Sequence, residues 1–243
     1  MKTILTKFSL IFIFTLLASG IVFSEEQKEQ IKPLIVKPVK RNRPPSDAVI
    51  LFDRGNLNQF SSVKDNSSVP WKVKGAFFTV VPGSGNIQTK QLFGDIQLHI
   101  EFKIPRAAKK REGQKSGKSG IYLMGKYEVQ VLNSFENETY PKGQAGAVYE
   151  QYAPLVNASL KPGKWQVYDI VFKAPDFNSN GSLIKPPCLT VFHNGVLIQD
   201  HVEVLGPTTS YNKELPEKTV KGPLMLQEHN NAVSYRNIWV RPL

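Results

Sequence analysis

The stretch DIQLHIEFKI, residues Asp95–Ile104, alternates between apolar and polar side chains along its whole length. A period of two is the pattern of a β-strand that buries one face and exposes the other. The apolar face holds Ile96, Leu98, Ile100, Phe102 and Ile104, and the polar face holds Gln97, His99, Glu101 and Lys103. This stretch therefore predicts a long strand at the surface of a packed sheet.

The same period recurs along the rest of the chain, and no segment shows a long helical period. Pairs of Gly and Pro mark the connections, and Asn194-Gly195 supplies the positive-φ turn of a hairpin. Further strands are predicted in Lys164–Lys173, Leu189–Val204, Gly222–His229 and Val233–Val240. Many strands without helices favour an all-β fold, a sandwich of two antiparallel sheets formed by residues 47–243.

The stretch SGIYLMGKYEVQVLNS, residues Ser119–Ser134, also alternates, but its second face is unusual. We interpret it as one strand that pairs with Asp95–Ile104, so that the polar faces of the two stretches join. Residues two apart on a strand lie about 7 Å apart, which would let Glu128 and Gln130 contact one sugar-sized ligand. The unusual face carries Tyr122, Met124, Lys126, Glu128 and Gln130.

The first residues are typical of an export signal. Lys2 and Lys7 precede the apolar run Phe8–Phe23, which is shorter than the roughly 20 residues of a membrane span. We predict a signal peptide at residues 1–24, no transmembrane segment in the mature chain, and a periplasmic or extracellular location. The alternative is an N-terminal membrane anchor. Residues 25–46 are rich in Lys and Pro and are predicted to be a tether, whose basic residues offer an association with the envelope.

Export is expected to remove the signal peptide near Ser24. The apolar run ends in small or tolerated residues at the positions that a signal peptidase reads. Measuring the intact mass of the secreted protein checks this expectation. A mature chain that still begins at Met1 would contradict it.

The net charge of +11 is concentrated in the tether and in Arg106–Lys118 (RAAKKREGQKSGK) rather than spread over one face. Nucleic-acid-binding domains present a basic face, and single-strand binders add aromatic stacking platforms. Because neither is evident, we predict no nucleic-acid partner and interpret Arg106–Lys118 as a solvated, mobile loop. The single cysteine, Cys188, allows no disulfide within the chain.

Several motifs, in order, resemble one bacterial family, the 3-keto-disaccharide hydrolases, also described as 3-keto-glucoside 1,2-lyases and 3-keto-2-hydroxy-glucal hydratases. The resemblance runs from about Val49 to Leu243 and implies a concanavalin A-like, laminin-G-like jelly roll. The chain departs from the family at Lys118, where the family often has Asn. The motifs are Ser119–Ser134, Gly143–Tyr149, Ala153–Ser159, Pro162–Gln166, Tyr168–Ile170, His193–Val196 and GPLMLQEH…YRNIWVRPL at the end.

The residues also bear on the kind of reaction. Glycosidases of the concanavalin A-like fold typically carry two acidic residues on one strand, and a retaining pair lies about 5 Å apart. Positions 128, 130 and 132 are Glu, Gln and Leu, so this local signature is absent. The family resemblance implies a different reaction, in which a ketone at C3 of the sugar acidifies the hydrogen on C2. One base tuned near the working pH then suffices for elimination, and addition of water completes the cleavage.

The resemblance and the face pattern together give a set of candidate residues. Glu128 or His229 is the candidate base. Lys126, Arg236 or a bound divalent cation is the candidate for stabilising the enolate oxygen, and no other cofactor is predicted. The predicted substrate-binding residues are Tyr122, Lys126, Gln130, Tyr149, Gln227, Arg236, Glu101 and His99.

Three classes of function stay open at the level of the sequence. The first is an exported enzyme that cleaves 3-keto-glycosides as a hydrolase or lyase. The second is a non-catalytic, lectin-like module that binds carbohydrate, since this fold alone does not fix a function. The third is a structural protein of the envelope. The first class predicts a groove lined with ionisable groups, the second predicts exposed aromatic platforms without a buried base, and the third predicts no groove.

Overall fold

The computed structural model describes residues 33, 35–37, 44–208 and 218–243. The predicted signal peptide and most of the predicted tether lie outside the described residues. Within the part that is described, no helix has both the length and the apolar character needed to span a membrane.

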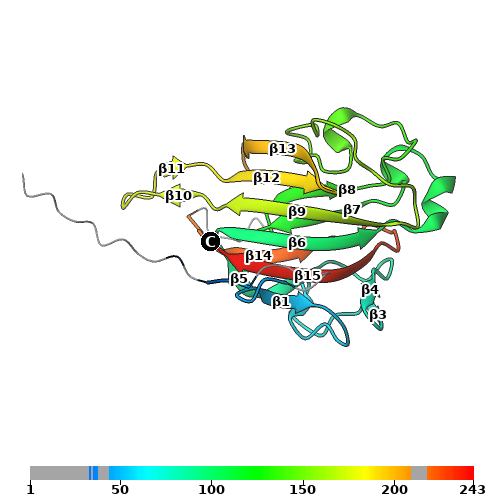
Figure 1. Cartoon of the computed structure of the whole chain (residues 1–243), viewed down its shortest axis with the longest axis horizontal. Helices are drawn as coiled ribbons and strands as arrows, with labels where there is room; N and C mark the ends of the chain where they lie inside the picture. The colour runs from blue at the N-terminus through cyan, green and yellow to red at the C-terminus, as the bar shows by residue number, and fades with distance from the viewer. Residues whose placement is uncertain (1–32, 34, 38–43, 209–217) are drawn as a thin grey trace, which may run out of the picture. The chain divides into compact units, whose positions relative to one another are not determined.

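Two antiparallel sheets make up the domain (Figure 1). Among the described residues, the larger sheet has eight strands in the order β13-β12-β9-β6-β15-β4-β3, with β1 paired to β15, and the smaller has five in the order β2-β5-β14-β7-β8. A short hairpin, β10–β11, stands apart (Figure 1). The strands are β1 (Val49–Phe52), β2 (Phe60–Ser62), β3 (Lys72–Lys74), β4 (Phe77–Thr79), β5 (Ile87–Phe93), β6 (Ile96–Lys103), β7 (Ser119–Leu123), β8 (Tyr127–Val131), β9 (Trp165–Lys173), β10 (Asp176–Phe177), β11 (Leu183–Lys185), β12 (Cys188–His193), β13 (Val196–Glu203), β14 (Gly222–Leu226) and β15 (Ser234–Pro242).

The period of two in β6 explains how the larger sheet packs. Leu98, Ile100 and Phe102 are fully buried, and the rings of Phe102 and Tyr168 lie 4.7 Å apart between their centroids. Val129 and Leu226 contribute from the smaller sheet to the same apolar core. Burial of these apolar faces is the main favourable term in holding the two sheets together. The predicted all-β sandwich of two antiparallel sheets is confirmed.

Residues Ser119–Ser134 do not form the single strand that we predicted. They form the hairpin β7–β8, whose turn residues Met124 and Gly125 have φ values of 53° and 66°. Two consecutive positive φ angles are the requirement of a type I′ turn. The register pairs Tyr122 with Glu128 and Gly120 with Gln130, so the even-numbered side chains still share one face, but across two strands.

The predicted pairing of this stretch with Asp95–Ile104 is also wrong. β7 pairs with β8 and β14, whereas β6 pairs with β9 and β15 in the other sheet. Both stretches alternate, but alternation defines the faces of a strand and does not identify its neighbour. The chain crosses from one sheet to the other over residues 104–118.

That crossing is an ordered connection rather than the solvated loop that we expected. It forms two short 3₁₀ turns, η1 (Arg106–Lys110) and η2 (Gly113–Lys115). The hydroxyl of Ser116 is buried, donates to the carbonyl of Ala108 at 2.9 Å, and accepts from the amide of Asn133 at 2.9 Å. The basic residues of the connection other than Lys118 are exposed around this buried anchor: Arg106, Lys109, Lys110, Arg111 and Lys115.

Candidate functional site

The polar face of the β7–β8 hairpin is buried beneath a connection rather than open to solvent. Residues 134–152, which we call the covering segment, contain η3 (Pro141–Gly143) and run beside β8. The backbone of Gln130 donates to Ala147 O at 3.0 Å and accepts from Gly146 N at 2.9 Å. Tyr149 N donates to Glu128 O at 3.2 Å. These bonds hold the covering segment against the row that contains Glu128.

Glu128 lies at the centre of this face, and its side chain is almost fully buried, with 2% of the residue exposed. Its Oε2 accepts a hydrogen bond from the hydroxyl of Tyr122 at 2.7 Å, and Tyr122 in turn accepts from Gln227 Nε2 at 2.8 Å. Its Oε1 is buried and has no hydrogen-bond partner among the described residues. One carboxylate oxygen is thus fixed by Tyr122, and the other is left to accept a proton.

Burial also controls the charge of Glu128. Removal from water raises the pKa of its carboxyl group, and this is the largest effect. The hydrogen bond from Tyr122 and the positive charge of Lys118 lower the pKa by a smaller amount, so that the pKa is about 7. A general base works best when its pKa lies near the working pH, because it is then both ionised and basic enough to take a proton. The environment of Glu128 meets this condition near neutrality.

Gly120 provides the space that the carboxylate occupies. It lies opposite Gln130 in the hairpin, and its backbone does not need a positive φ. A Cβ atom at this position would lie 2.4 Å from Glu128 Oε1 and 2.8 Å from Tyr122 Cε2. The glycine is therefore required here for close approach rather than for backbone conformation.

The two glutamines of the site also present unpaired oxygen atoms. Gln130 Nε2 donates to Gln114 Oε1 at 3.0 Å and to Gly143 O at 3.2 Å, while its Oε1 has no partner among the described residues. Gln227 Oε1 is likewise buried and unpaired within the described chain. Since buried polar atoms are normally hydrogen-bonded, these acceptors, with Glu128 Oε1, point to a missing ligand rich in hydroxyl groups.

Lys118 joins the site, although the sequence interpretation placed it in the basic loop. It immediately precedes β7, and only 7% of the residue is exposed. Its Nζ donates to the Tyr149 hydroxyl at 3.1 Å and lies 4.4 Å from the centroid of that ring. The Tyr140 hydroxyl donates to the same Tyr149 oxygen at 2.8 Å. The sequence held a signal that we missed. Lys118 and Tyr122 are both at even-numbered positions, and alternation along a strand places such side chains on the same face.

His229 and Lys126 lie at the two ends of this arrangement. His229 follows β14, is exposed, and has its pKa lowered by partial burial and by the charge of Lys118. Because Lys118 acts electrostatically on both His229 and Glu128, the three groups are neighbours. Lys126 adjoins the hairpin turn, and its carbonyl accepts from the hydroxyl of Thr208 at 3.0 Å. The structure thus brings together Tyr122, Glu128, Gln130, Tyr149 and Gln227, with Lys126 and His229 at the edges.

Glu101, His99 and Arg236 do not belong to this site. They lie on the outer face of the larger sheet, with Glu101 on β6 opposite Arg236 on β15. Arg236 Nε donates to Glu101 Oε2 at 2.5 Å, and Asn237 Nδ2 donates to Glu101 Oε1 at 2.8 Å. Both oxygens of Glu101 are therefore occupied. The prediction that His99 and Glu101 bind the substrate was wrong because it depended on the incorrect strand pairing. The prediction for Arg236 was wrong because its strand, β15, lies in the larger sheet beside β6.

The ring of His99 completes a second polar network on that outer face. Its Nδ1 lies 2.6 Å from Asp169 Oδ1, and the ring stacks on Trp239 with centroids 5.1 Å apart. Burial alone would lower the pKa of His99, but its hydrogen bond to Asp169 and the Glu101 carboxylate 3.9 Å away outweigh burial and raise the pKa to about 9. These groups satisfy one another, which makes the network a support for the sheet.

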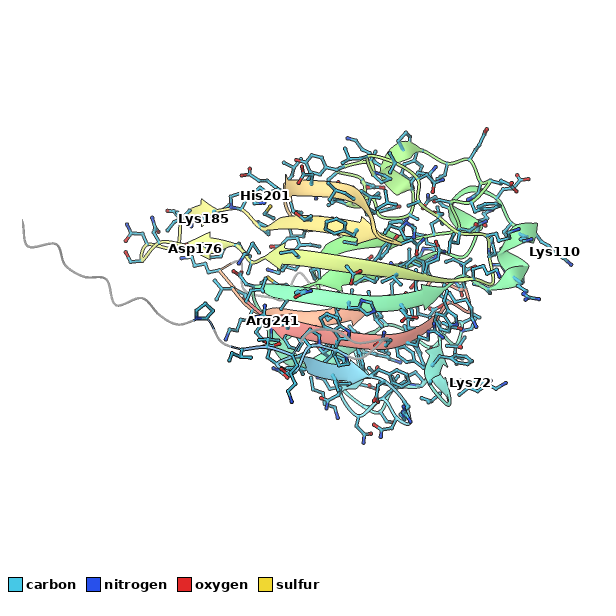
Figure 2. All side chains as sticks on the ribbon, viewed as in Figure 1. Lys72, Lys110, Asp176, Lys185, His201 and Arg241 are labelled. Atoms are coloured by element: carbon cyan, nitrogen blue, oxygen red, sulfur yellow. The ribbon has the colours of Figure 1, made fainter. Side chains whose placement is uncertain are left out.

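A pocket of about 760 Å³ is also separate from the Glu128 site. It lies around the β10–β11 hairpin, and its lining includes Asp176, Lys185 and His201 (Figure 2). Figure 2 shows Lys110, in η1, at the opposite end of the sandwich from Asp176 and Lys185. Within the described chain, no three His, Cys, Asp or Glu side chains converge as metal ligands.

Comparison with known proteins places the whole domain in one family. The model of the 3-keto-alpha-glucoside-1,2-lyase-like domain matches residues 47–241. A solved structure of a candidate glycosyl hydrolase from Parabacteroides distasonis is 41% identical, with a TM-score of 0.81, and the match covers 93% of this chain and 98% of that one. No curated protein matches.

A second solved structure shares the fold at lower identity. It is another candidate glycosyl hydrolase from Parabacteroides distasonis, 16% identical with a TM-score of 0.58, and the match covers 81% of this chain and 94% of that one. The first structure is similar over nearly the full length of both proteins, and the family model spans both sheets. The chain therefore belongs to the family of 3-keto-α-glucoside-1,2-lyase-like domains, which supports a carbohydrate-active function.

Proposed function

We propose that this protein is an exported enzyme that cleaves 3-keto-glycosides by removing the proton on C2 of the sugar. The observation that carries the proposal is the buried carboxylate of Glu128, with one oxygen held by Tyr122 and the other without a partner in the described chain. A pKa of about 7 suits such a base near neutrality. The position two residues on is Gln130, so the row lacks the second carboxylate of an ordinary glycosidase.

The first step of the proposed reaction is an elimination. Glu128 Oε1 takes the proton from C2, and the electrons of the broken C–H bond move toward C3, whose carbonyl oxygen becomes an enolate. The enolate then collapses: the C3 carbonyl reforms, a C1–C2 double bond forms, and the bond from C1 to the departing oxygen breaks. That oxygen takes a proton, which releases the aglycone and leaves a 3-keto-2-hydroxy-glucal.

The second step is a hydration. The oxygen of a water molecule bonds to C1, and Glu128, whose proton has exchanged with solvent, protonates C2, so that the product is the free 3-keto sugar. We assign the solvent-side proton transfers to His229, which gives a proton to the leaving oxygen and takes one from the incoming water. Its exposed position supports this role, because an exposed imidazole exchanges protons with solvent. Over both steps the protein gains and loses no proton.

The remaining residues are proposed to bind the sugar. Gln130 and Gln227 offer their unpaired Oε1 atoms to hydroxyl groups, and Tyr149 offers the face of its ring that Lys118 does not cover. Glu128 Oε1 has almost no exposed surface in this arrangement, so substrate entry requires the covering segment to shift. Lectin-like binding without chemistry is the second candidate, but a binding module has no need for a buried base with a raised pKa.

A panel of substrates tests the proposal. The purified protein is incubated with several 3-keto-glycosides and with the same glycosides carrying an ordinary hydroxyl at C3. Release of the aglycone from the keto substrates alone is expected, because only a C3 ketone acidifies the C2 hydrogen. Cleavage of both sets at similar rates would indicate an ordinary glycosidase. Binding without cleavage would leave a lectin-like module, and neither binding nor cleavage would favour a structural protein.

A further inference from the structure

We propose that Lys118 is the group that stabilises the enolate oxygen formed at C3 of the substrate. This inference rests on the proposed function and adds a catalytic residue to it. The sequence interpretation offered Lys126, Arg236 or a divalent cation for this role. Arg236 lies on the other sheet, bound to Glu101, and Lys126 adjoins the hairpin turn at the edge of the site.

The ammonium group of Lys118 is buried without a carboxylate partner. Only 7% of the residue is exposed, and no Asp or Glu oxygen of the described residues lies within 4.0 Å of its Nζ. Within the described chain, Lys118 Nζ donates a hydrogen bond to the neutral hydroxyl of Tyr149. An ammonium has three N–H donors, so it retains donors for an incoming oxygen. A buried charge with so few partners is costly, which indicates that the site is built to receive a negative charge.

Lys118 and Glu128 are linked through Tyr149, whose hydroxyl accepts from Lys118 Nζ and whose backbone N–H donates to Glu128 O. Lys118 is close enough for its charge to act on Glu128, yet the two groups do not form an ion pair. The C2 hydrogen and the C3 oxygen of one ring require this arrangement, with a base at one atom and a cation at the next. A base and a cation bonded directly to each other would neutralise one another before the substrate arrived.

The charge balance of the step is simple. As the C2–H bond breaks, its electron pair forms the C2–C3 double bond of the enolate, and the C3 oxygen becomes negative. Lys118 donates a hydrogen bond to that oxygen and keeps its proton throughout. When the C1–O bond breaks, the C3 carbonyl reforms and the hydrogen bond weakens again. Lys118 therefore interacts more strongly with the enolate than with the ketone, which is the condition for lowering the barrier.

Tyr149 acts as the positioning residue for Lys118. Its hydroxyl accepts from Lys118 Nζ, its ring lies 4.4 Å from the same atom, and Tyr140 holds the hydroxyl from the other side. The Tyr149→Phe change keeps the ring and removes only the hydrogen bond. It is expected to lower turnover less than loss of the Lys118 charge does.

The experiment compares Lys118→Met and Lys118→Arg with the wild-type protein. Exchange of the C2 hydrogen of a 3-keto-glycoside with deuterated water is followed by NMR, together with kcat and KM for cleavage. Loss of one preorganised oxyanion donor typically costs about 10²- to 10³-fold in kcat. We expect this loss for Lys118→Met, with KM changed little, and partial recovery for Lys118→Arg because it keeps the positive charge.

The pH profile provides a readout that a merely structural role would not move. Removing the Lys118 charge is expected to shift the acid limb of kcat/KM to higher pH, since that charge lowers the pKa of Glu128. Lys118→Arg is expected to keep the wild-type limb. The other ionisable groups that act electrostatically with Glu128 are Glu150, Tyr149 and Tyr235. All three are present in both Lys118→Met and Lys118→Arg.

The possible outcomes separate the two proposals. A folded Lys118→Met protein with wild-type C2 exchange would overturn the role of Lys118 and leave the proposed function in place. A borohydride-trapped adduct that disappears in Lys118→Met would also overturn it, because the amine would then attack the ketone rather than stabilise its oxygen. Absence of C2 exchange in the wild-type protein would remove the proposed function, and the role of Lys118 with it.

Discussion

Replacing Glu128 with Gln is expected to lower the turnover of a 3-keto-glycoside by about 10²- to 10⁴-fold. The amide keeps the size of the side chain and can still accept the hydrogen bond from Tyr122, but it cannot take the C2 proton. Substrate affinity should therefore change little, because Gln130, Gln227 and Tyr149 are untouched. Single-turnover measurements and equilibrium binding of an unreactive analogue distinguish the loss of chemistry from a loss of binding.

Glu150→Gln is the matched control for this change. Glu150 is an exposed glutamate whose charge reaches Glu128, but nothing places it against the substrate. The same substitution there is expected to alter kcat by no more than about threefold, since an exposed charge is screened by solvent. Equal activity of Glu128→Gln and wild type would show that another group is the base.

The same Glu128→Gln variant should be more stable than the wild type at alkaline pH. The carboxyl has a pKa of about 7 when folded, against an ordinary value of 4.5. Between these values the folded state binds more protons than the unfolded state, so Glu128 makes stability fall as pH rises through this window. Gln removes this penalty, which is on the order of 1 to 3 kcal/mol above pH 7. Urea unfolding at pH 5 and pH 8 measures it, and a variant less stable at pH 8 would contradict the assigned environment.

Gly120→Ala should lower turnover by about 10²-fold while the protein remains folded. The added methyl group would lie 2.4 Å from Glu128 Oε1 and 2.8 Å from the Tyr122 ring, so the carboxylate must move. The backbone at Gly120 does not lie in the left-handed region, which means that Ala introduces no conformational strain there. Steady-state kinetics and a far-ultraviolet spectrum of the variant check both halves of the prediction.

A double-mutant cycle shows whether the added methyl group acts through Glu128. Gly120→Ala is expected to cost much less in the Glu128→Gln background than in the wild type, because the displaced base is already absent. Full additivity of the two losses would mean that Gly120 affects catalysis by a different route. Wild-type activity of a folded Gly120→Ala protein would contradict the geometry of the site.

The sequence predicts the fold better than it predicts the neighbours within it. Alternation in Asp95–Ile104 correctly separated the core-facing side chains of β6 from its half-buried polar row. Alternation also grouped Tyr122, Glu128 and Gln130 correctly, since the three-residue connection 124–126 between the paired residues Leu123 and Tyr127 preserves parity across the hairpin. Periodicity does not identify the partner strand, which is why His99 and Glu101 were predicted to lie beside Glu128.

Lys118 illustrates a second limit of the sequence. It ends a run rich in lysine and arginine, and composition alone classes such residues as solvated. In the structure, Ser116 and Ala108 anchor that run, and the chain turns inward before β7. The departure from the family at Lys118 was visible in the sequence, but its burial beside Glu128 depends on how the covering segment packs, which no local pattern encodes.

The fate of the C2 hydrogen tests the central claim most directly. The wild-type protein is incubated with a 3-keto-glycoside in deuterated water, and the recovered substrate and the product are examined by NMR at C2. Elimination followed by hydration must break the C2–H bond, so the product is expected to carry deuterium at C2 and a C2-deuterated substrate is expected to react more slowly. Cleavage with the original hydrogen retained at C2 and no isotope effect there would contradict the elimination mechanism and the assignment of Glu128 as its base.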